Sequence, residues 1–222
     1  MDFQQGLITT IHEYGITKDL INELNKGLKN RPTAILIPCL YEEFERPALK
    51  SIKEVLKNLN GLNELVIALS AKSIEQVKSA KSFFESMPFP VHLQWTNSPS
   101  VIELLKSQEK NGLELLGTPG KGWAVWQGIG VATRKSEVVA LFDADIRTFS
   151  SLYPSKMILP LLDDSYGISY VKAFYSRLSL ETNELQGRAT RLFVGPLLDS
   201  LEQLVGKGPF LQYLQSFRYP LA

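Results

Sequence analysis

Val138-Val139-Ala140-Leu141-Phe142-Asp143-Ala144-Asp145 is the stretch of sequence that decides the fold class. Its first five residues are apolar without alternation, as in a strand that is covered on both faces of a parallel sheet. Two carboxylates separated by one alanine follow directly. In open α/β sheets, ligands bind beyond the carboxyl ends of the strands. The stretch therefore predicts an α/β protein with a functional loop that starts at Asp143.

Other apolar runs of strand length alternate with helical patterns. One helical pattern starts at Pro47, and a second starts at Ser73, where Gln76 completes a capping box. Strands that are separated by helices imply right-handed crossovers. The sequence therefore predicts a mostly parallel, Rossmann-like sheet with helices on both faces. The other strands of this sheet are predicted at residues 34–38, 65–69 and 91–95.

Both ends of the chain depart from this rhythm. The first 30 residues indicate a helical lead-in with apolar residues such as Leu20 and Leu24. Beyond Phe142 we predict a strand at residues 168–174 and a last helix within residues 190–205, which starts or kinks at Pro196. We expect three parts, which are residues 1–30, 31–150 and 151–222.

The composition excludes several classes of protein. The 222 residues include 24 Lys and Arg against 23 Asp and Glu, a formal net charge of +1, which argues against nucleic-acid or anionic-membrane binding. We find no signal peptide pattern and no apolar run of about 18 residues, so we expect a cytoplasmic protein. The single cysteine, Cys39, cannot form an internal disulfide and indicates a reducing compartment. No histidine lies near it in sequence, so we expect a buried, unreactive thiol.

Asp143 and Asp145 are candidate ligands of a divalent cation. The strand before them brings two carboxylates, spaced by one small residue, to the edge of the sheet. This arrangement suits Mg²⁺ or Mn²⁺ that holds a diphosphate. A turn or a helix cap is the alternative, since loops use aspartate for both. The position after a buried strand favours the metal.

Pro119-Gly120-Lys121-Gly122-Trp123 opens another predicted helix. Glycines around a lysine at a helix start let the backbone approach a phosphate, and the helix N-terminus and the ammonium both favour an anion. The stretch is not a P-loop, because Gly122 stands where Ser or Thr is required. A surface turn with a solvated lysine is the alternative, but a nucleoside-diphosphate site explains this stretch and the aspartate pair together. We expect Trp123 and Trp126 to pack in the core.

Gln186-Gly187-Arg188-Ala189-Thr190-Arg191 precedes the last predicted helix. Glycine, arginine and a hydroxyl at a helix start can hold a carboxylate or a phosphate, with Arg188 as a bidentate donor. A capped helix start with two exposed arginines is the alternative.

Five motifs occur in a fixed order along the chain from about Arg31 onward. They are Ile37-Pro38-Cys39-Leu40-Tyr41-Glu42-Glu43, Gly120-Lys121-Gly122, Asp143-Ala144-Asp145, Val171-Lys172-Ala173-Phe174-Tyr175 and Gly187-Arg188-Ala189-Thr190. As an ordered set they resemble the GT-A glycosyltransferases that make glucosyl-3-phosphoglycerate or mannosyl-3-phosphoglycerate. The resemblance implies transfer of a hexosyl group from a UDP- or GDP-hexose to 3-phosphoglycerate with retention of configuration. Among the hexosyl groups it favours glucosyl. It also implies dependence on Mg²⁺ or Mn²⁺.

The resemblance assigns donor contacts residue by residue. Pro38, Leu40 and Glu42 match the segment that holds the uridine in the glucosyl-transferring enzymes. Ser70 matches a residue that contacts the base, and Lys121 matches a contact of the donor phosphates. The resemblance thus makes residues 31–150 the part that binds the nucleotide sugar.

Metal and acceptor contacts are implied in the same way. Asp143 matches the acid near the ribose, and Asp145 matches the acid that binds the metal. Residues 151–222 become the start of an acceptor-binding part. No catalytic residue is assigned within the chain. The loop that grips 3-phosphoglycerate matches Gly187, Arg188, Ala189 and Thr190.

The chain departs from the family pattern in two places. Ala68-Leu69-Ser70-Ala71 replaces a loop of the Asp-Ser-Gly-Ser type, which leaves one polar side chain for the base. The family also continues past a Pro-Leu segment into a Gly-Glu-Tyr/Phe-Ala motif and a later histidine metal ligand, whereas this sequence ends at Ala222. We therefore expect a C-terminally shortened transferase with weak or absent turnover.

Two other functions stay open at this point. One is a non-catalytic nucleotide-binding or interaction module of the same fold. The other is a sugar-phosphate nucleotidyltransferase, which ranks last because residues 38–43 contain no glycine. The sequence does not decide the donor base, the sugar or the oligomeric state, and a homodimer remains open.

Overall fold

The computed structural model describes residues 4–5, 8–9, 19–109, 120–173, 177–178, 185–186, 193 and 195–206. Contacts within the chain group it into two units. One unit is Gly15–Val171, and the other combines Met1–Tyr14 with Lys172–Ala222. The predicted division of the chain at residues 30 and 150 remains a prediction.

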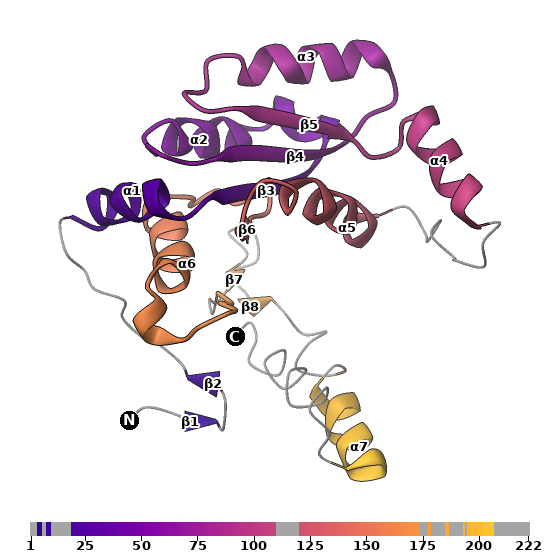
Figure 1. Cartoon of the computed structure of the whole chain (residues 1–222). Coiled ribbons are helices and arrows are strands. Elements are labelled where there is room, and N and C mark those ends of the chain that lie inside the picture. The colour runs from indigo at the N-terminus through magenta and orange to yellow at the C-terminus, as the bar shows by residue number, and fades with distance from the viewer. Residues whose placement is uncertain are drawn as a thin grey trace. The chain divides into compact units, whose positions relative to one another are not determined.

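The Gly15–Val171 unit contains a four-stranded parallel sheet in the order β5-β4-β3-β6 (Figure 1). All four predicted strands of this sheet are confirmed, with bounds that differ by a few residues. From β3 the chain continues to β4 and β5 on one side and then returns to place β6 on the other side of β3. Ligands bind in such sheets at the switch point, the point where the strand order reverses, which here lies at the carboxyl ends of β3 and β6. The strands are β3 (Thr33–Leu40), β4 (Glu64–Ser70), β5 (Val91–Trp95) and β6 (Val138–Leu141).

Helices and short 3₁₀ turns connect these strands. The two predicted helix starts are confirmed. Pro47 is the first residue of its helix, and the Ser73 hydroxyl accepts the Gln76 backbone N–H at 3.4 Å. None of the described helices is long and apolar enough to cross a membrane. The helices of this unit are α1 (Leu20–Asn30), α2 (Pro47–Leu56), α3 (Ile74–Phe84), α4 (Pro99–Glu109), α5 (Lys121–Ala132) and α6 (Leu152–Leu162), with turns η1 (Tyr41–Glu45) and η2 (Asp164–Tyr166).

Helix α5 packs closely on β3 and β4, and Figure 1 shows it on the side of the sheet away from α3. A Cβ atom added at Gly128 would lie 2.4 Å from Leu36 Cδ1 and 3.3 Å from Ala68 Cβ. Both neighbours are fully buried. Gly128 therefore permits the short separation between helix and sheet, and this separation fixes where the first residue of α5 lies.

The expectation that Trp126 packs in the core is wrong. Its side chain is 51% exposed, and the buried positions of α5 are Ala124, Gln127, Gly128 and Ala132. A helix that approaches a sheet this closely presents small residues to it, so the large indole lies on the opposite face. Trp123 is only partly buried.

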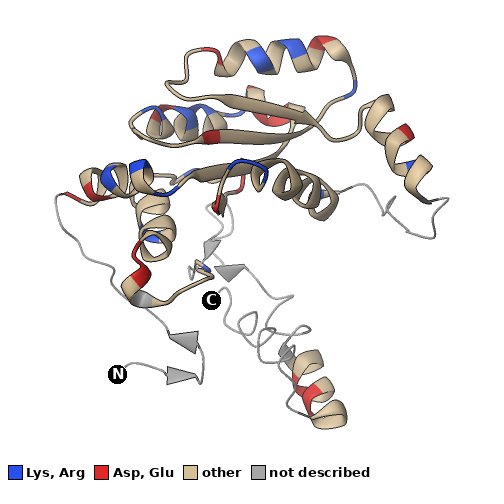
Figure 2. Ribbon diagram, in the orientation of Figure 1, with Lys and Arg blue, Asp and Glu red and all other residues tan. Residues whose placement is uncertain are grey.

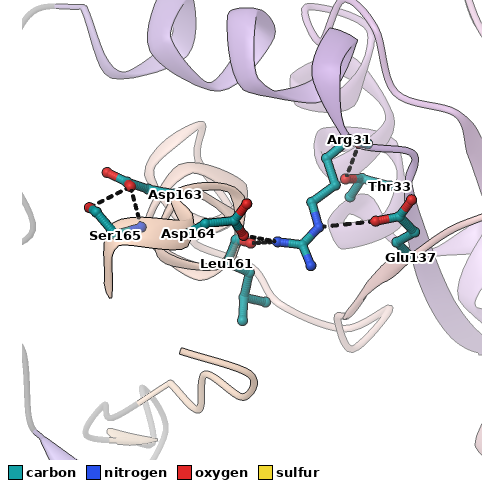
Figure 3. Close-up of polar contacts among 7 residues, drawn as sticks. All are labelled: Arg31, Thr33, Glu137, Leu161, Asp163, Asp164 and Ser165. Atoms are coloured by element: carbon teal, nitrogen blue, oxygen red, sulfur yellow. Dashed lines mark hydrogen bonds and ion pairs between the residues drawn. The ribbon is translucent and has the colours of Figure 1, made fainter. Parts of the chain in front are cut away.

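Arg31 connects α1, the start of β6 and the end of α6 (Figure 3). Its Nη1 donates to the Leu161 carbonyl at 2.6 Å and lies 3.1 Å from Asp164 Oδ1. Its Nε lies 3.3 Å from Glu137 Oε2. A cation at the last carbonyls of a helix is favourable. The contact ties the predicted helical lead-in to the α/β unit.

We expect Arg31→Ala to lower the free energy of unfolding by about 1–2 kcal/mol, because a helix-end carbonyl and two carboxylates lose their shared partner. Urea denaturation followed by circular dichroism measures the change. Arg134→Ala, at an exposed arginine after α5, is the matched control and should stay within about 0.5 kcal/mol of the parent. Equal effects of the two substitutions would contradict the assignment.

The second unit is described through short elements. β1 (Gln4–Gln5) pairs antiparallel with β2 (Ile8–Thr9), and β7 (Arg177–Leu178) pairs antiparallel with β8 (Leu185–Gln186). Helix α7 (Gly195–Val205) begins one residue before Pro196, which confirms the predicted last helix.

The strand expected at residues 168–174 is not found in its described part. Residues 168–173 form no strand, and residue 174 lies outside the described residues. Gly167 precedes them in a left-handed conformation with φ of 60°. The chain turns there, and residues 168–173 pair with no strand among the described residues.

Candidate functional site

Predicted site residues from four separate segments lie at the carboxyl edge of the sheet. Leu40 and Ser70 are directly paired at the ends of β3 and β4. Pro38 is buried within β3, two residues before that end. The remaining described members follow β3 or β6 or begin α5. They are Glu42, Lys121, Asp143 and Asp145.

Lys121 and Asp143 form an ion pair at the switch point. Lys121 is the first residue of α5, and its Nζ lies 2.6 Å from Asp143 Oδ1. The lysine side chain is 60% exposed and the aspartate side chain 24% exposed. The first N–H groups of a helix have no partners within the helix and attract anions. An ammonium, a helix N-terminus and a carboxylate therefore converge beyond the end of β6, and Figure 2 shows charge of both signs there.

Gly122 follows in the first turn of α5. A Cβ atom placed there would have no neighbour within 4 Å among the described residues. Packing against the described residues therefore does not explain this glycine, which costs helix stability relative to alanine. The open space above it is what a close approach by a ligand needs.

Asp145 is exposed in the turn two residues beyond Asp143. Two carboxylates on one loop fit Mg²⁺ or Mn²⁺, since these ions keep several waters and share the oxygens of substrate phosphates. Among the described residues, no group of three or more His, Cys, Asp or Glu is placed to hold a metal. The described chain therefore offers part of a coordination shell at this loop.

Turn η1 presents Glu42 beside β4. Glu42 Oε1 accepts a hydrogen bond from Lys72 Nζ at 3.0 Å. Its own backbone N–H and then Lys72 lower the pKa of the Glu42 carboxyl, so the group stays ionised at neutral pH. Phe44 anchors the turn, with its ring 5.8 Å from that of Phe84 on α3. The Tyr41 hydroxyl adds a hydrogen bond of 3.2 Å to Ser79.

The loop after β4 is held by the end of β5. The Ala71 N–H donates to Asn97 Oδ1 at 3.1 Å, and the Ala71 carbonyl accepts from Asn97 Nδ2 and from Trp95 Nε1, each at 3.0 Å. Neither Lys72 nor Asn97 was expected at the site. The position of Lys72, three residues past the end of a predicted strand, is the signal that could have identified it.

Cys39 is buried next to this site, as expected. It is 4% exposed, and burial, followed by the charges of Glu43 and Glu42, raises the pKa of the thiol to about 12. Glu43 is itself buried and lies 2.5 Å from Arg46 Nη1. The negative charges of the two carboxylates disfavour the negatively charged thiolate form of Cys39.

We expect Cys39 to react with a disulfide reagent at pH 8 at least about 100-fold more slowly in the folded chain than in urea, since only the thiolate is nucleophilic. The unfolded chain loses the thiol proton near the ordinary pKa of 9.0, whereas the folded chain retains it to about 12. Stability is therefore lost as the pH rises between these values. Fast modification of the folded chain at pH 8 would refute this prediction, and Cys39→Ser provides the blank.

The predicted acceptor residues, Gly187, Arg188, Ala189 and Thr190, lie outside the described residues. Their role stays a prediction.

A hollow of about 700 Å³ lies away from this edge, between α1 and the loop that precedes β4. Its lining consists of charged and amide side chains, including Asp19, Lys26 and Asn60. None of the predicted site residues lines it.

Comparison with known proteins confirms the predicted resemblance and the GT-A fold. No protein-family model matches the chain. Glucosyl-3-phosphoglycerate synthase of Methanococcoides burtonii is 38% identical over an alignment of 223 positions, which covers 100% of this chain and 55% of the relative. The enzyme of the same name from Persephonella marina is 33% identical over an alignment of 224 positions, which covers 99% of this chain and 55% of the relative. The chain thus spans about half the length of these curated relatives.

A solved structure gives the same result. Glucosyl-3-phosphoglycerate synthase from Mycobacterium tuberculosis, crystallised with Mn²⁺, UDP-glucose and phosphoglyceric acid, matches with a TM-score of 0.56 and 25% identity. The match covers 89% of this chain and 58% of that one. Both comparisons thus point to the same family.

Proposed function

We propose that this chain contains the donor-binding part and the start of the acceptor-binding part of a glycosyltransferase that moves a glucosyl group from UDP-glucose to 3-phosphoglycerate with retention of configuration. The observation that carries the proposal is the convergence of Lys121, Asp143 and Asp145 at the switch point of the sheet. The similarity to glucosyl-3-phosphoglycerate synthases along the whole chain supports it.

In this proposal the donor lies across the carboxyl ends of the strands. Lys121 exchanges its pairing with Asp143 for the diphosphate, assisted by the N–H groups of the first turn of α5. Pro38, Leu40 and Glu42 hold the nucleoside, and Asp143 accepts from the ribose. Ser70 contacts the base. Because Leu40 and Ser70 are paired in register, one nucleoside can contact both strand ends.

A divalent cation completes the site, with Asp145 as the ligand that this chain supplies. When bound, Mg²⁺ or Mn²⁺ stabilises the charge that develops on the departing nucleoside diphosphate. The positive charge of the Lys121 ammonium stabilises negative charge on the same phosphate oxygens. The role of the chain in the transfer is thus to position and neutralise the leaving group.

Acceptor binding falls to the second unit in this proposal. Gly187, Arg188, Ala189 and Thr190 hold 3-phosphoglycerate, with Arg188 as the bidentate donor to an acidic group. We keep the predicted cytoplasmic location as part of the proposal.

Calorimetric titration with UDP, with and without Mn²⁺, tests the proposed function. We expect saturable binding of UDP that Mn²⁺ strengthens. The absence of heat in both titrations, from a chain that unfolds cooperatively, would overturn the proposal. After addition of UDP-glucose and 3-phosphoglycerate, acceptor-dependent release of UDP would exclude a nucleotide-binding module, whereas absent turnover agrees with both a shortened transferase and such a module.

A further inference from the structure

Lys72 and Glu42 bridge the carboxyl ends of two neighbouring strands. Glu42 follows β3, Lys72 follows β4, and their charged groups lie 3.0 Å apart. The lysine side chain is 81% exposed and the glutamate side chain 50% exposed. The pair is therefore accessible to solvent at the edge of the sheet that carries the proposed donor site.

The backbone on both sides of this pair is fixed. Hydrogen bonds from Asn97 and Trp95 hold Ala71, and the Lys72 N–H donates to Gln76 Oε1 at 2.7 Å. On the other side, the packing of Phe44 on α3 holds η1. These contacts thus fix the backbone from which the Lys72 side chain extends.

The order of strands gives the distance between the end of β4, which precedes Lys72, and the end of β6, where the phosphates are proposed to bind. β3 lies between β4 and β6. Neighbouring strands lie about 4.8 Å apart, so the ends of β4 and β6 are separated by roughly 10 Å. A nucleoside diphosphate whose phosphates contact Lys121 at the end of β6 spans a comparable length. Its base then reaches the end of β4, where Lys72 lies.

An ammonium group only donates hydrogen bonds. Uracil presents a carbonyl oxygen at the position where cytosine carries an amino group, as thymine does on the exposed edge of DNA base pairs. One N–H of Lys72 is directed to Glu42, and the others remain for a base. A carbonyl at that position accepts from the lysine, whereas an amino group leaves two donors facing each other.

We propose that Lys72 selects the base of the donor, favouring a uracil nucleotide over a cytosine nucleotide through the carbonyl oxygen. The assignment rests on the proposed function. It gives the loop after β4, which retains one polar side chain in Ser70, a second contact for the base.

The test compares UDP with CDP, each with Mn²⁺, by calorimetry on the parent chain and on Lys72→Met. We expect the parent to bind UDP roughly tenfold or more tightly than CDP, and Lys72→Met to bring the ratio close to one. Loss of the Glu42 contact alone would lower the affinities for UDP and CDP by the same factor. The ratio of the two affinities therefore isolates the effect of Lys72 on the base. Lys78→Met, at an exposed lysine on α3, should keep the parental ratio.

Binding of UDP with an unchanged ratio of UDP to CDP affinity in Lys72→Met overturns the assignment of Lys72 and leaves the proposed function standing. Failure of the parent chain to bind either nucleotide overturns the proposed function and this assignment with it. Thermal unfolding of each variant verifies that the chain is folded.

Discussion

We expect a chain that carries Asp145→Asn to bind UDP with an affinity that Mn²⁺ no longer increases. The amide keeps the size of the carboxylate but removes its negative charge, and divalent cations of this type prefer carboxylate oxygen. We expect UDP affinity in the presence of Mn²⁺ to fall roughly 10- to 100-fold, equal to about 1.4–2.8 kcal/mol. Calorimetry with and without the metal measures this loss.

The metal-free titration makes this result specific. Since Asp145 is exposed, its substitution should leave both the fold and the metal-free affinity for UDP unchanged. Asp19→Asn, at an exposed aspartate before α1, is the matched control and should keep the full response to Mn²⁺. Retention of that response in Asp145→Asn would show that the metal is held elsewhere.

Gly128→Val is expected to have the largest effect on stability. A single added Cβ at this position already lies 2.4 Å from Leu36 Cδ1, and valine adds two further methyl groups against fully buried neighbours. Overpacking of a filled core costs typically about 1–3 kcal/mol and occasionally more, and we expect the upper part of this range. Urea denaturation measures the loss.

Gly130 provides the control on the same helix. A Cβ added there meets no atom of the described residues within 4 Å, so Gly130→Ala should be neutral or stabilise by up to about 1 kcal/mol through helix propensity. Adding Leu36→Ala to Gly128→Val should recover part of the lost stability, because it removes the atoms that clash. If Gly128→Val is as stable as Gly130→Ala, α5 does not depend on this close approach.

The strands of the sheet could be predicted because each is a continuous apolar run whose length excludes a typical helix. Helix starts with a definite chemistry, such as Ser73 with Gln76, were also predictable. Helix α6 was not predicted, since it contains Pro154 and Pro160. Pro154 lies in the first turn, where the backbone N–H has no partner within the helix. Pro160 lies inside the helix, and a proline at such a position predicts the end of a helix.

The candidate site shows the same division between local and long-range information. The rule that ligands bind at strand ends predicted the neighbourhood of Asp143 and Leu40. It did not predict the pairing of Lys121 with Asp143 or of Lys72 with Glu42, which join residues 22 and 30 positions apart. Gly128 likewise reads in sequence as one helix glycine among several. Its role becomes visible only where Leu36 from another element occupies the space of its missing side chain.

The placement of β6 beside β3 has a consequence for the order in which the site forms. β3 and β4 pair at a separation of about thirty residues, whereas β3 and β6 pair across more than a hundred. Closing the longer loop costs more chain entropy, and contacts of long sequence separation slow folding. We therefore expect the part of the edge around Leu40 and Ser70, where we propose that the nucleoside binds, to assemble before Asp143 and Asp145 reach it. The proposed site for a base would then form earlier than the proposed site for a metal.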